Sequence, residues 1–173
     1  MVQIFETLNF KELSSAKNDF ILRINCKDLN KINNINENTK DLLKGFWIDK
    51  SKFIELNEIL ETNILTDLKS ILILDSSISS AIDNDQFAAL NNTFNVYFYY
   101  GSKVKSSNYE KHFYDYSLNC LNGVCFDIDL VSKGLVALAN KFNLEPIIVN
   151  AKYERHLEVA TNLNVDKVLV TGS

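Results

Sequence analysis

Three aspartates stand at points of the sequence where buried strands are expected to end. Asp75 closes one apolar run, and Asp127 and Asp129 close another. Carboxylates gathered at the carboxyl edge of a parallel sheet are ligands that Mg²⁺ and Mn²⁺ prefer, and such metals activate water. One interpretation is therefore a metal-dependent nuclease. Against it, the later segment Val149-Asn150-Ala151-Lys152 lacks an acidic pair, and strand-end aspartates commonly cap helices.

Aromatic residues form a second candidate site. Tyr97, Tyr99 and Tyr100 lie in one expected strand, and their rings are of a type that stacks on nucleotide bases. The alternative, which we favour, is that alternate tyrosines of the strand point into the core and the helix layer. His112 and His156 fall within expected helices, and we interpret both as surface or interface residues rather than general bases.

Short apolar runs predict the strands that would position these residues. Most of the runs are continuous rather than alternating, which is typical of parallel strands covered on both faces. The expected strands are Val2–Phe5, Phe20–Ile24, Ile71–Leu74, Asn95–Tyr100, Val124–Ile128, Ile147–Val149 and Lys167–Val170.

Helical spacing of apolar residues fills the intervals between these runs. Such stripes begin at Tyr109, Val131 and Leu157, and another helix is expected to start at an N-cap formed by Ser51. The regular alternation of strand and helix predicts right-handed βαβ units in an α/β fold. No Pro- or Gly-rich linker divides the chain, so residues 1–173 are expected to form one domain.

Local signals set some element boundaries. Asn143 and Asn164 each follow a helical stripe, and asparagine tolerates the left-handed conformation that ends helices. Pro146 stands where a strand would begin, a position at which its missing N–H does no harm. The segment Lys27–Lys44, rich in Asn, Asp and Lys, is expected to be an irregular surface insertion.

Composition excludes several classes of function. The net charge is −4 and only five residues are glycine, so the chain has neither the basic stripe of a nucleic-acid-binding protein nor a Gly-rich phosphate loop. We expect a cytoplasmic protein without membrane segments. The three cysteines lack zinc-ligand spacing and are expected to be free buried thiols, and we expect no cofactor.

The order of the expected strands resembles the EAL family of cyclic-di-GMP phosphodiesterases. The most specific stretch is Ala137–Val168, where Ala-Leu-Ala, Asn143-Leu144, a strand, Glu154, Leu157, Leu163 and Asp166 follow the family pattern without gaps. Upstream segments resemble the family's other strand motifs in order. These are Glu6-Thr7-Leu8 for the EAL signature, Ile24-Asn25-Cys26 for VNLS, Ile71–Ser76 for LELTES, Asn95–Tyr100 for ALDDFG and Leu118–Asp129 for LRRLPVDYLKID.

The resemblance implies a parallel (β/α) barrel of EAL type. A full barrel of this kind takes about 250 residues, whereas this chain has 173. The deficit falls between Glu6 and Ile24, where the family has longer helical material. The barrel is therefore expected to be shortened or incomplete near the N-terminus, with the first strand missing or a partner completing the barrel.

The resemblance also implies that the catalytic site is lost. Of the residues that bind the metals directly in the family, only those at Glu6 and Asn25 persist. The family's other ligand and phosphate-binding positions are occupied here by Leu72, Tyr99, Tyr100, Asp127, Val149, Lys152 and Phe10, while Asp129 keeps a family aspartate. Hard divalent metals need several oxygen ligands, so hydrolysis by this mechanism is not expected.

We therefore expect a catalytically inactive EAL-like regulator in bacterial signalling that binds another protein or a second copy of itself. A receptor that binds cyclic-di-GMP without hydrolysis is the first alternative and is not favoured. Its ligand-binding candidates are Tyr97, Tyr99, Tyr100, Asp127 and Asp129. The metal-dependent nuclease, of PIN- or NYN-like type, is the second alternative.

Overall fold

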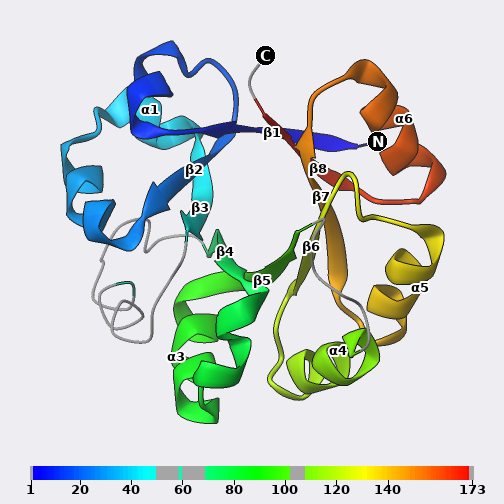
Figure 1. Ribbon diagram of the computed structural model, residues 1–173. Coiled ribbons are helices and arrows are strands. Elements are labelled where there is room, and N and C mark those ends of the chain that lie inside the picture. The colour runs from blue at the N-terminus through cyan, green and yellow to red at the C-terminus, as the bar shows by residue number, and fades with distance from the viewer. Residues whose placement is uncertain (1, 50–58, 60–68, 102–107, 172–173) are drawn as a thin grey trace.

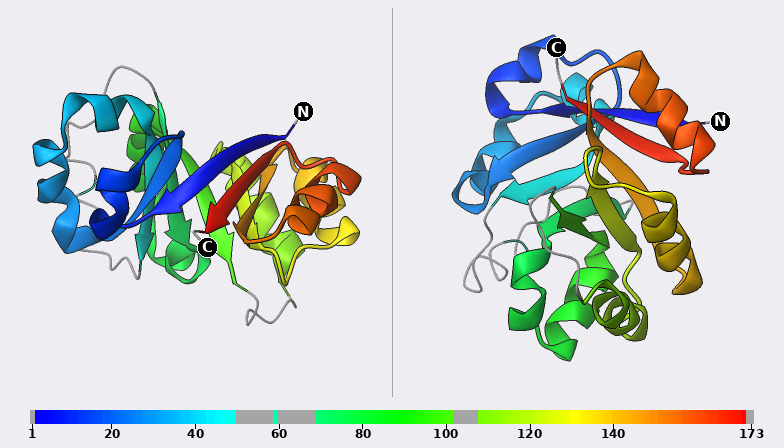
Figure 2. Two further views of the ribbon diagram at one scale, coloured as in Figure 1. Left: turned by 90° about the horizontal axis from the view of Figure 1, so that it is seen from above. Right: turned by 45° about the vertical axis from the view of Figure 1, so that its right-hand side comes forward.

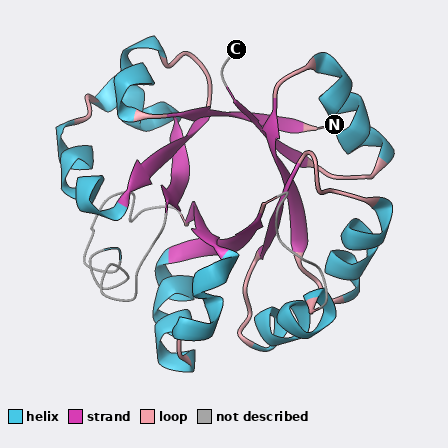
Figure 3. Ribbon diagram, viewed as in Figure 1, coloured by secondary structure: helices cyan, strands magenta, loops and turns pink. Residues whose placement is uncertain are grey.

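A closed barrel of parallel strands forms the centre of the molecule, surrounded by helices (Figures 1 and 3). The computed structural model describes residues 2–49, 59, 69–101 and 108–171. The strands follow one another around the barrel in chain order: β1 Gln3–Leu8, β2 Phe20–Asn25, β3 Leu43–Asp49, β4 Ser70–Asp75, β5 Phe94–Tyr100, β6 Gly123–Asp127, β7 Glu145–Ala151 and β8 Lys167–Thr171.

Pairing between the first and last strands closes the barrel. β1 pairs with β8 from Gln3 opposite Lys167 to Thr7 opposite Thr171, and Figure 2 shows the two strands side by side. The fold is therefore the (β/α) barrel expected from the sequence, but the expectation of an incomplete barrel is wrong. β1 is present and needs no partner, because its backbone groups pair with β2 on one side and β8 on the other.

Short connections explain how so few residues close a barrel. The first two strands are followed by 3₁₀ helices, η1 Phe10–Ser15 and η2 Cys26–Asn34, and β4 is followed by η3 Ser76–Ala81. The α-helices are brief as well, most of them about half the length of the 20 residues that would span 30 Å. They are α1 Glu37–Leu42, α3 Asn84–Thr93, α4 Tyr109–Leu118, α5 Lys133–Lys141 and α6 Glu154–Asn162.

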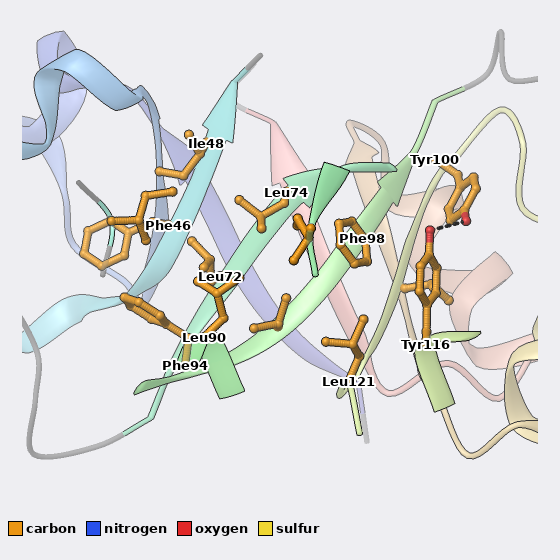
Figure 4. Packing of buried hydrophobic residues seen from close by; sticks show 14 of the residues in the cluster. Phe46, Ile48, Leu72, Leu74, Leu90, Phe94, Phe98, Tyr100, Tyr116 and Leu121 are labelled. Atoms are coloured by element: carbon orange, nitrogen blue, oxygen red, sulfur yellow. Dashed lines mark hydrogen bonds between the residues drawn. The ribbon is translucent and has the colours of Figure 1, made fainter. Parts of the chain in front are cut away.

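Alternation along each strand builds two separate cores. One set of side chains fills the inside of the barrel, as in other barrels of this type. Its buried members are Phe5, Ile21, Trp47, Ile71, Ile73, Tyr97, Cys125, Ile147, Val149 and Leu169. The intervening residues point outward, where Leu72, Leu74 and Phe98 pack under the helices (Figure 4). Burial on both faces is the reason that the strands read as continuous apolar runs.

Left-handed residues end two helices where the sequence predicts it. Asn143 follows α5 with φ 58° and Asn164 follows α6 with φ 57°. Each next residue, Leu144 or Val165, donates its backbone N–H to a carbonyl within the preceding helix. The predicted stop signals are confirmed, because asparagine adopts this conformation at low cost.

β3 was not among the strands predicted from the sequence, and its buried residues include Phe46, Trp47 and Ile48. Gly45 and the flanking charges of Lys44 and Asp49 interrupt the apolar run there. The expected irregular insertion at Lys27–Lys44 is also wrong, since η2, α1 and the start of β3 occupy it.

The helix expected after Ser51 and the cysteines expected to be buried are confirmed only in part. The helix expected after Ser51 lies outside the described residues, apart from Ile59, which is helical and buried. The thiol of Cys125 is buried and free as expected, whereas Cys120 is free but exposed, because it lies in the turn that follows α4. Within the described part of the chain, no helix combines the length and the hydropathy that a bilayer crossing requires.

Candidate functional site

The carboxyl ends of the strands gather polar and aromatic side chains at one mouth of the barrel, the end at which barrel enzymes place their active sites. A cavity of about 450 Å³ opens there. The described residues that line it are Arg23, Asn25, Trp47, Ile48, Asp49, Asp75 and Tyr99. We call this cavity the mouth cavity.

An ion pair and two aromatic rings form one wall of the mouth cavity. The Nε–H of Arg23 donates to Oδ1 of Asp49 over 2.9 Å, and both side chains are partly exposed. The guanidinium carbon of Arg23 lies 4.1 Å from the centroid of the Trp47 ring, within cation–π range. Tyr99 packs against the same indole with centroids 4.9 Å apart and an interplanar angle of 59°. The wall is therefore held by contacts among three strands.

Asp127 is the most buried carboxylate at this end of the barrel, with 8% of its surface exposed. Its Oδ2 accepts hydrogen bonds from the hydroxyl of Tyr99 at 3.2 Å and from Nδ2 of Asn150 at 2.8 Å. Its Oδ1 accepts from the backbone N–H of Asp129 at 2.9 Å. These bonds satisfy a charge that would be costly to bury alone.

A bulge in β7 aims Asn150 at this network. The pairing of β7 with β8 shifts between Ile148 and Ala151, and Asn150 has a φ of 62°. Bulges redirect side chains in this way. The amide of Asn150 bonds to Asp127 through its nitrogen and accepts from the hydroxyl of Thr171 over 3.3 Å. The bulge thus ties three strands together at the mouth.

The predicted ligand-binding tyrosines separate into different environments. Only Tyr99 lines the mouth cavity. The hydroxyl of Tyr97, inside the barrel, donates to Oε1 of Glu145 over 2.6 Å. Tyr100 points outward under α4, where its hydroxyl lies 2.7 Å from that of Tyr116 (Figure 4). Tyr97 and Tyr100 are each only 1% exposed, so neither is available to stack on a base.

Burial raises the pKa values of these tyrosines. Desolvation is the main cause of the raised pKa for both Tyr97 and Tyr100. The next cause is the hydrogen bond to Glu145 for Tyr97 and the charge of Tyr116 for Tyr100. Desolvation and then the charge of Asp127 raise the pKa of Tyr99 to about 12. All of them are therefore neutral phenols at physiological pH.

The two metal-ligand positions predicted to persist do not lie together. Asn25 lines the mouth cavity at the end of β2. Glu6 lies between Phe5 and Thr7, which face the barrel interior, so it points outward, and its Oε1 accepts from Nδ2 of Asn18 over 3.1 Å. Among the residues described, no group of three or more His, Cys, Asp or Glu side chains is placed to hold a metal ion.

The predicted nuclease aspartates do not form one pocket either. Asp75 lines the mouth cavity, and its Oδ1 caps η3 by accepting from the N–H of Ser77 over 2.9 Å. Asp127 is enclosed by its hydrogen bonds, and the side chain of Asp129 is exposed. The sequence located strand ends correctly, but it did not show which carboxylates already have partners.

Four residues of this mouth were not predicted from the sequence: Arg23, Trp47, Asp49 and Asn150. Arg23 carried a signal, since it is the only charge within the apolar run Phe20–Ile24. Trp47 is the only tryptophan of the chain, but it lies in the strand that was missed. Asn150 was noted in the sequence only because no acidic residue stands at its position. Its role depends on a bulge in β7 that no residue pattern predicts.

The raised pKa of Tyr99 predicts a loss of stability in alkali. The unfolded chain releases this proton near pH 10, whereas the folded protein holds it up to about pH 12. The corresponding stabilisation is fully present below pH 10 and is lost as the pH rises through 12. Tyr97 and Tyr100 contribute with the same sign.

Urea unfolding of Tyr99→Phe and the wild type between pH 8 and 12 checks this prediction, since the range spans both values of the pKa. We expect the variant to lose less stability than the wild type across the alkaline part of the range. Parallel stability curves for the two proteins would show that Tyr99 ionises as in the unfolded chain.

Comparisons with known proteins support the fold alone. No family model and no curated protein sequence matches this chain. Among solved structures, it is similar to a glycerol uptake operon antiterminator regulatory protein from Listeria monocytogenes, with a TM-score of 0.69 and 8% identity over 99% of this chain and 92% of that one.

Two enzymes of the same fold are also similar. Phosphoribosyl anthranilate isomerase from Thermus thermophilus has a TM-score of 0.61 and 9% identity, over 98% of this chain and 87% of that chain. A protein named as a glycerophosphodiester phosphodiesterase from Galdieria sulphuraria has a TM-score of 0.53 and 12% identity, over 84% of this chain and 58% of that one. The neighbours are TIM barrels, and they include both a regulator and enzymes.

Proposed function

We propose that this protein is a non-catalytic, EAL-like regulatory barrel that acts by binding another protein. The observation that carries the proposal is the state of the carboxylates at the mouth. Asp49 is bonded to Arg23, Asp75 to the N–H of Ser77, and Asp127 to Tyr99, Asn150 and the N–H of Asp129. A hydrolytic metal site needs such oxygens to converge on an ion.

The similarity to an antiterminator regulatory protein is consistent with a regulatory role for a barrel of this size. Fold and function are separable, however, so the proposal depends on the mouth and not on the neighbour. Retention of cyclic-di-GMP as a ligand receives less support. That ligand carries two phosphate charges, whereas Asp49 and Asp75 outnumber Arg23 among the described residues that line the mouth cavity.

A groove on the outside of the barrel supports the protein-binding part of the proposal. It lies between β1 and α6, has a volume of about 430 Å³ and is lined by Val2, Ile4, Glu154, Leu157, Glu158, Thr161 and Asn162. Ile4 is 44% exposed, unusual for an isoleucine on a barrel strand. In Figure 1 the first residues of β1 run beside α6.

The charges of the groove indicate the chemistry of its partner. Glu154 and Glu158 are exposed and stand four residues apart on α6, a spacing at which like charges repel. No lysine or arginine is among the described residues that line the groove. We therefore propose a partner that inserts apolar side chains over Ile4 and places Lys or Arg beside the two glutamates.

A phosphodiesterase assay tests the non-catalytic part of this function. Cyclic-di-GMP and bis(p-nitrophenyl) phosphate are incubated with the protein and Mg²⁺ or Mn²⁺, and we expect no turnover. The double variant Asp75→Asn, Asp127→Asn is the control for contaminating activity. Turnover by the wild type that this variant lacks would overturn the proposal.

Affinity capture from the native cells tests the partner. The protein recovered with the wild type is identified, and its dissociation constant is measured for Ile4→Asp and for Glu154→Lys, Glu158→Lys. We expect both changes to weaken binding at least about tenfold, a cost of about 1.4 kcal/mol. Tyr114→Ser, at an exposed tyrosine on α4, is the matched control. Equal affinities for all variants would exclude the groove.

A further inference from the structure

The lining of the mouth cavity offers both signs of charge and an aromatic wall, a combination that the non-catalytic function leaves without a role. Arg23 and Asn25 supply N–H donors, and Asp49 and Asp75 supply carboxylate acceptors. Tyr99 supplies flat apolar surface in the same cavity, and the buried ring of Trp47 packs against it. These groups come from β2, β3, β4 and β5, so the pairing of these neighbouring strands assembles them.

An unpartnered hydroxyl lies on the barrel side of β1. Thr7 is 7% exposed, and its Oγ1 has no hydrogen-bond partner among the described residues. It follows Phe5 by two positions and therefore faces the interior, near the carboxyl end of its strand. Buried hydroxyls are normally satisfied, so this one leaves a hydrogen bond open to a polar group that the described residues do not supply, although Thr7 itself is not among the residues that line the mouth cavity.

The charges of the mouth cavity narrow the chemistry of a ligand. The guanidinium of Arg23 is already paired with Asp49, and Asp75 leaves an excess of negative charge among the described residues that line the cavity. Asp127 adds a further carboxylate just behind Tyr99. A phosphate or carboxylate would be repelled by this excess, and an ammonium group has no lone pair that could accept from Arg23 and Asn25. Neutral hydroxyl groups both donate to the carboxylates and accept from Arg23 and Asn25.

Resting on the non-catalytic function above, we propose that the mouth cavity binds a neutral polyhydroxylated molecule about the size of one sugar ring. The hydroxyls bridge Arg23 and Asn25 to Asp49 and Asp75, and a C–H face of the molecule packs on Tyr99. The hydroxyl of Tyr99 donates to Asp127 and keeps a lone pair for the ligand. The volume of about 450 Å³ accommodates one such ring.

Fluorescence of Trp47 is a direct probe, because this residue lines the cavity and is the only tryptophan. The titrants are neutral D-glucose, D-galactose, D-ribose, myo-inositol and glycerol, with glucose 6-phosphate and glucosamine as charged matches of glucose. We expect a saturable change with at least one neutral compound at millimolar concentration. The charged matches should bind at least about tenfold more weakly than glucose where glucose binds.

Variants separate the groups that recognise the ligand. Tyr99→Ala should abolish binding of the neutral compound. Tyr99→Phe, which keeps the ring and removes only the hydroxyl, is measured in case the alanine variant does not fold. Asp75→Asn keeps an oxygen that can cap η3 but removes a charge, so it should raise the relative affinity for glucose 6-phosphate. Tyr153→Ala, at an exposed residue before α6, should change nothing.

No saturable signal with any neutral compound, or tighter binding of the phosphate than of glucose, would overturn this inference. Either result leaves the proposed function intact as long as no phosphodiester is hydrolysed. Turnover in the phosphodiesterase assay would instead overturn the proposed function.

Discussion

Gly45→Ala and Gly123→Ala are each expected to destabilise the protein by about 3 to 5 kcal/mol, a large part of the stability of an ordinary domain. Both glycines sit where neighbouring strands approach closely at the amino end of the barrel. A Cβ at Gly45 would lie 2.7 Å from Cβ of Ile71 and overlap the Ile71 carbonyl oxygen. A Cβ at Gly123 would lie 2.9 Å from the backbone nitrogen of Glu145 and overlap that residue's carbonyl oxygen.

The loss of stability is large because paired strands, and not side chains, would have to move apart. Ile71 and Glu145 are paired with the two glycines in the β3–β4 and β6–β7 ladders. The atoms in collision are backbone atoms and the Cβ of Ile71, none of which moves when a side chain rotates, so no rotamer change relieves the overlap. Separation of the strands would break ladder hydrogen bonds, and in a closed barrel that strain spreads to the other strands.

Gly134→Ala is the matched control for these glycine changes. Gly134 is exposed in the first turn of α5, and the nearest atom to an added Cβ is Oγ of Ser132 at 3.9 Å. Alanine has the higher helix propensity, so this variant should gain up to about 1 kcal/mol. Urea unfolding followed by Trp47 fluorescence measures all three variants. A loss below about 0.5 kcal/mol at Gly45 would show that the strands can separate there.

Trp47→Ala is expected to cost about 3 to 5 kcal/mol and to disable the mouth cavity at the same time. Trp47 is 1% exposed and belongs to the interior core of the barrel. Its removal leaves a cavity beneath Tyr99 and takes away the ring over which the guanidinium of Arg23 lies at 4.1 Å. The cation–π contact alone is worth about 0.5 to 2 kcal/mol.

Circular dichroism follows this unfolding, because the variant lacks the only tryptophan. Trp47→Phe is the matched control: it keeps an aromatic ring beneath Arg23 and should lose clearly less stability than the alanine variant. Calorimetry with the neutral compound that binds the wild type then measures the affinity of the mouth cavity for that compound in each variant. A stability and an affinity of Trp47→Ala equal to those of the wild type would show that neither the packing nor the stacking of Trp47 matters.

The amino-acid sequence alone determined the fold class and most of the elements. Runs such as Phe20–Ile24 and Val124–Ile128 are buried on both faces, so they are apolar throughout and recognisable without a structure. Asn143 and Asn164 marked helix ends because their left-handed conformation is a local property of the residue. β3 was missed because Gly45 and its charged neighbours interrupt the run, although the glycine is required by the close approach of Ile71.

Only the tertiary structure decided whether the barrel closes and which strand-end residues have partners. Closure depends on the pairing of β1 with β8, two segments at opposite ends of the chain. The sequence placed Asp75, Tyr99 and Asp127 at strand ends, but their bonds join them to residues far along the chain or to a helix cap. Glu6 was predicted to share a site with Asn25. Side chains alternate between the two faces of a strand, however, and the side chain of Glu6 lies on the outer face of β1. Such partners meet only when every strand has its register, and short-range patterns do not carry that information.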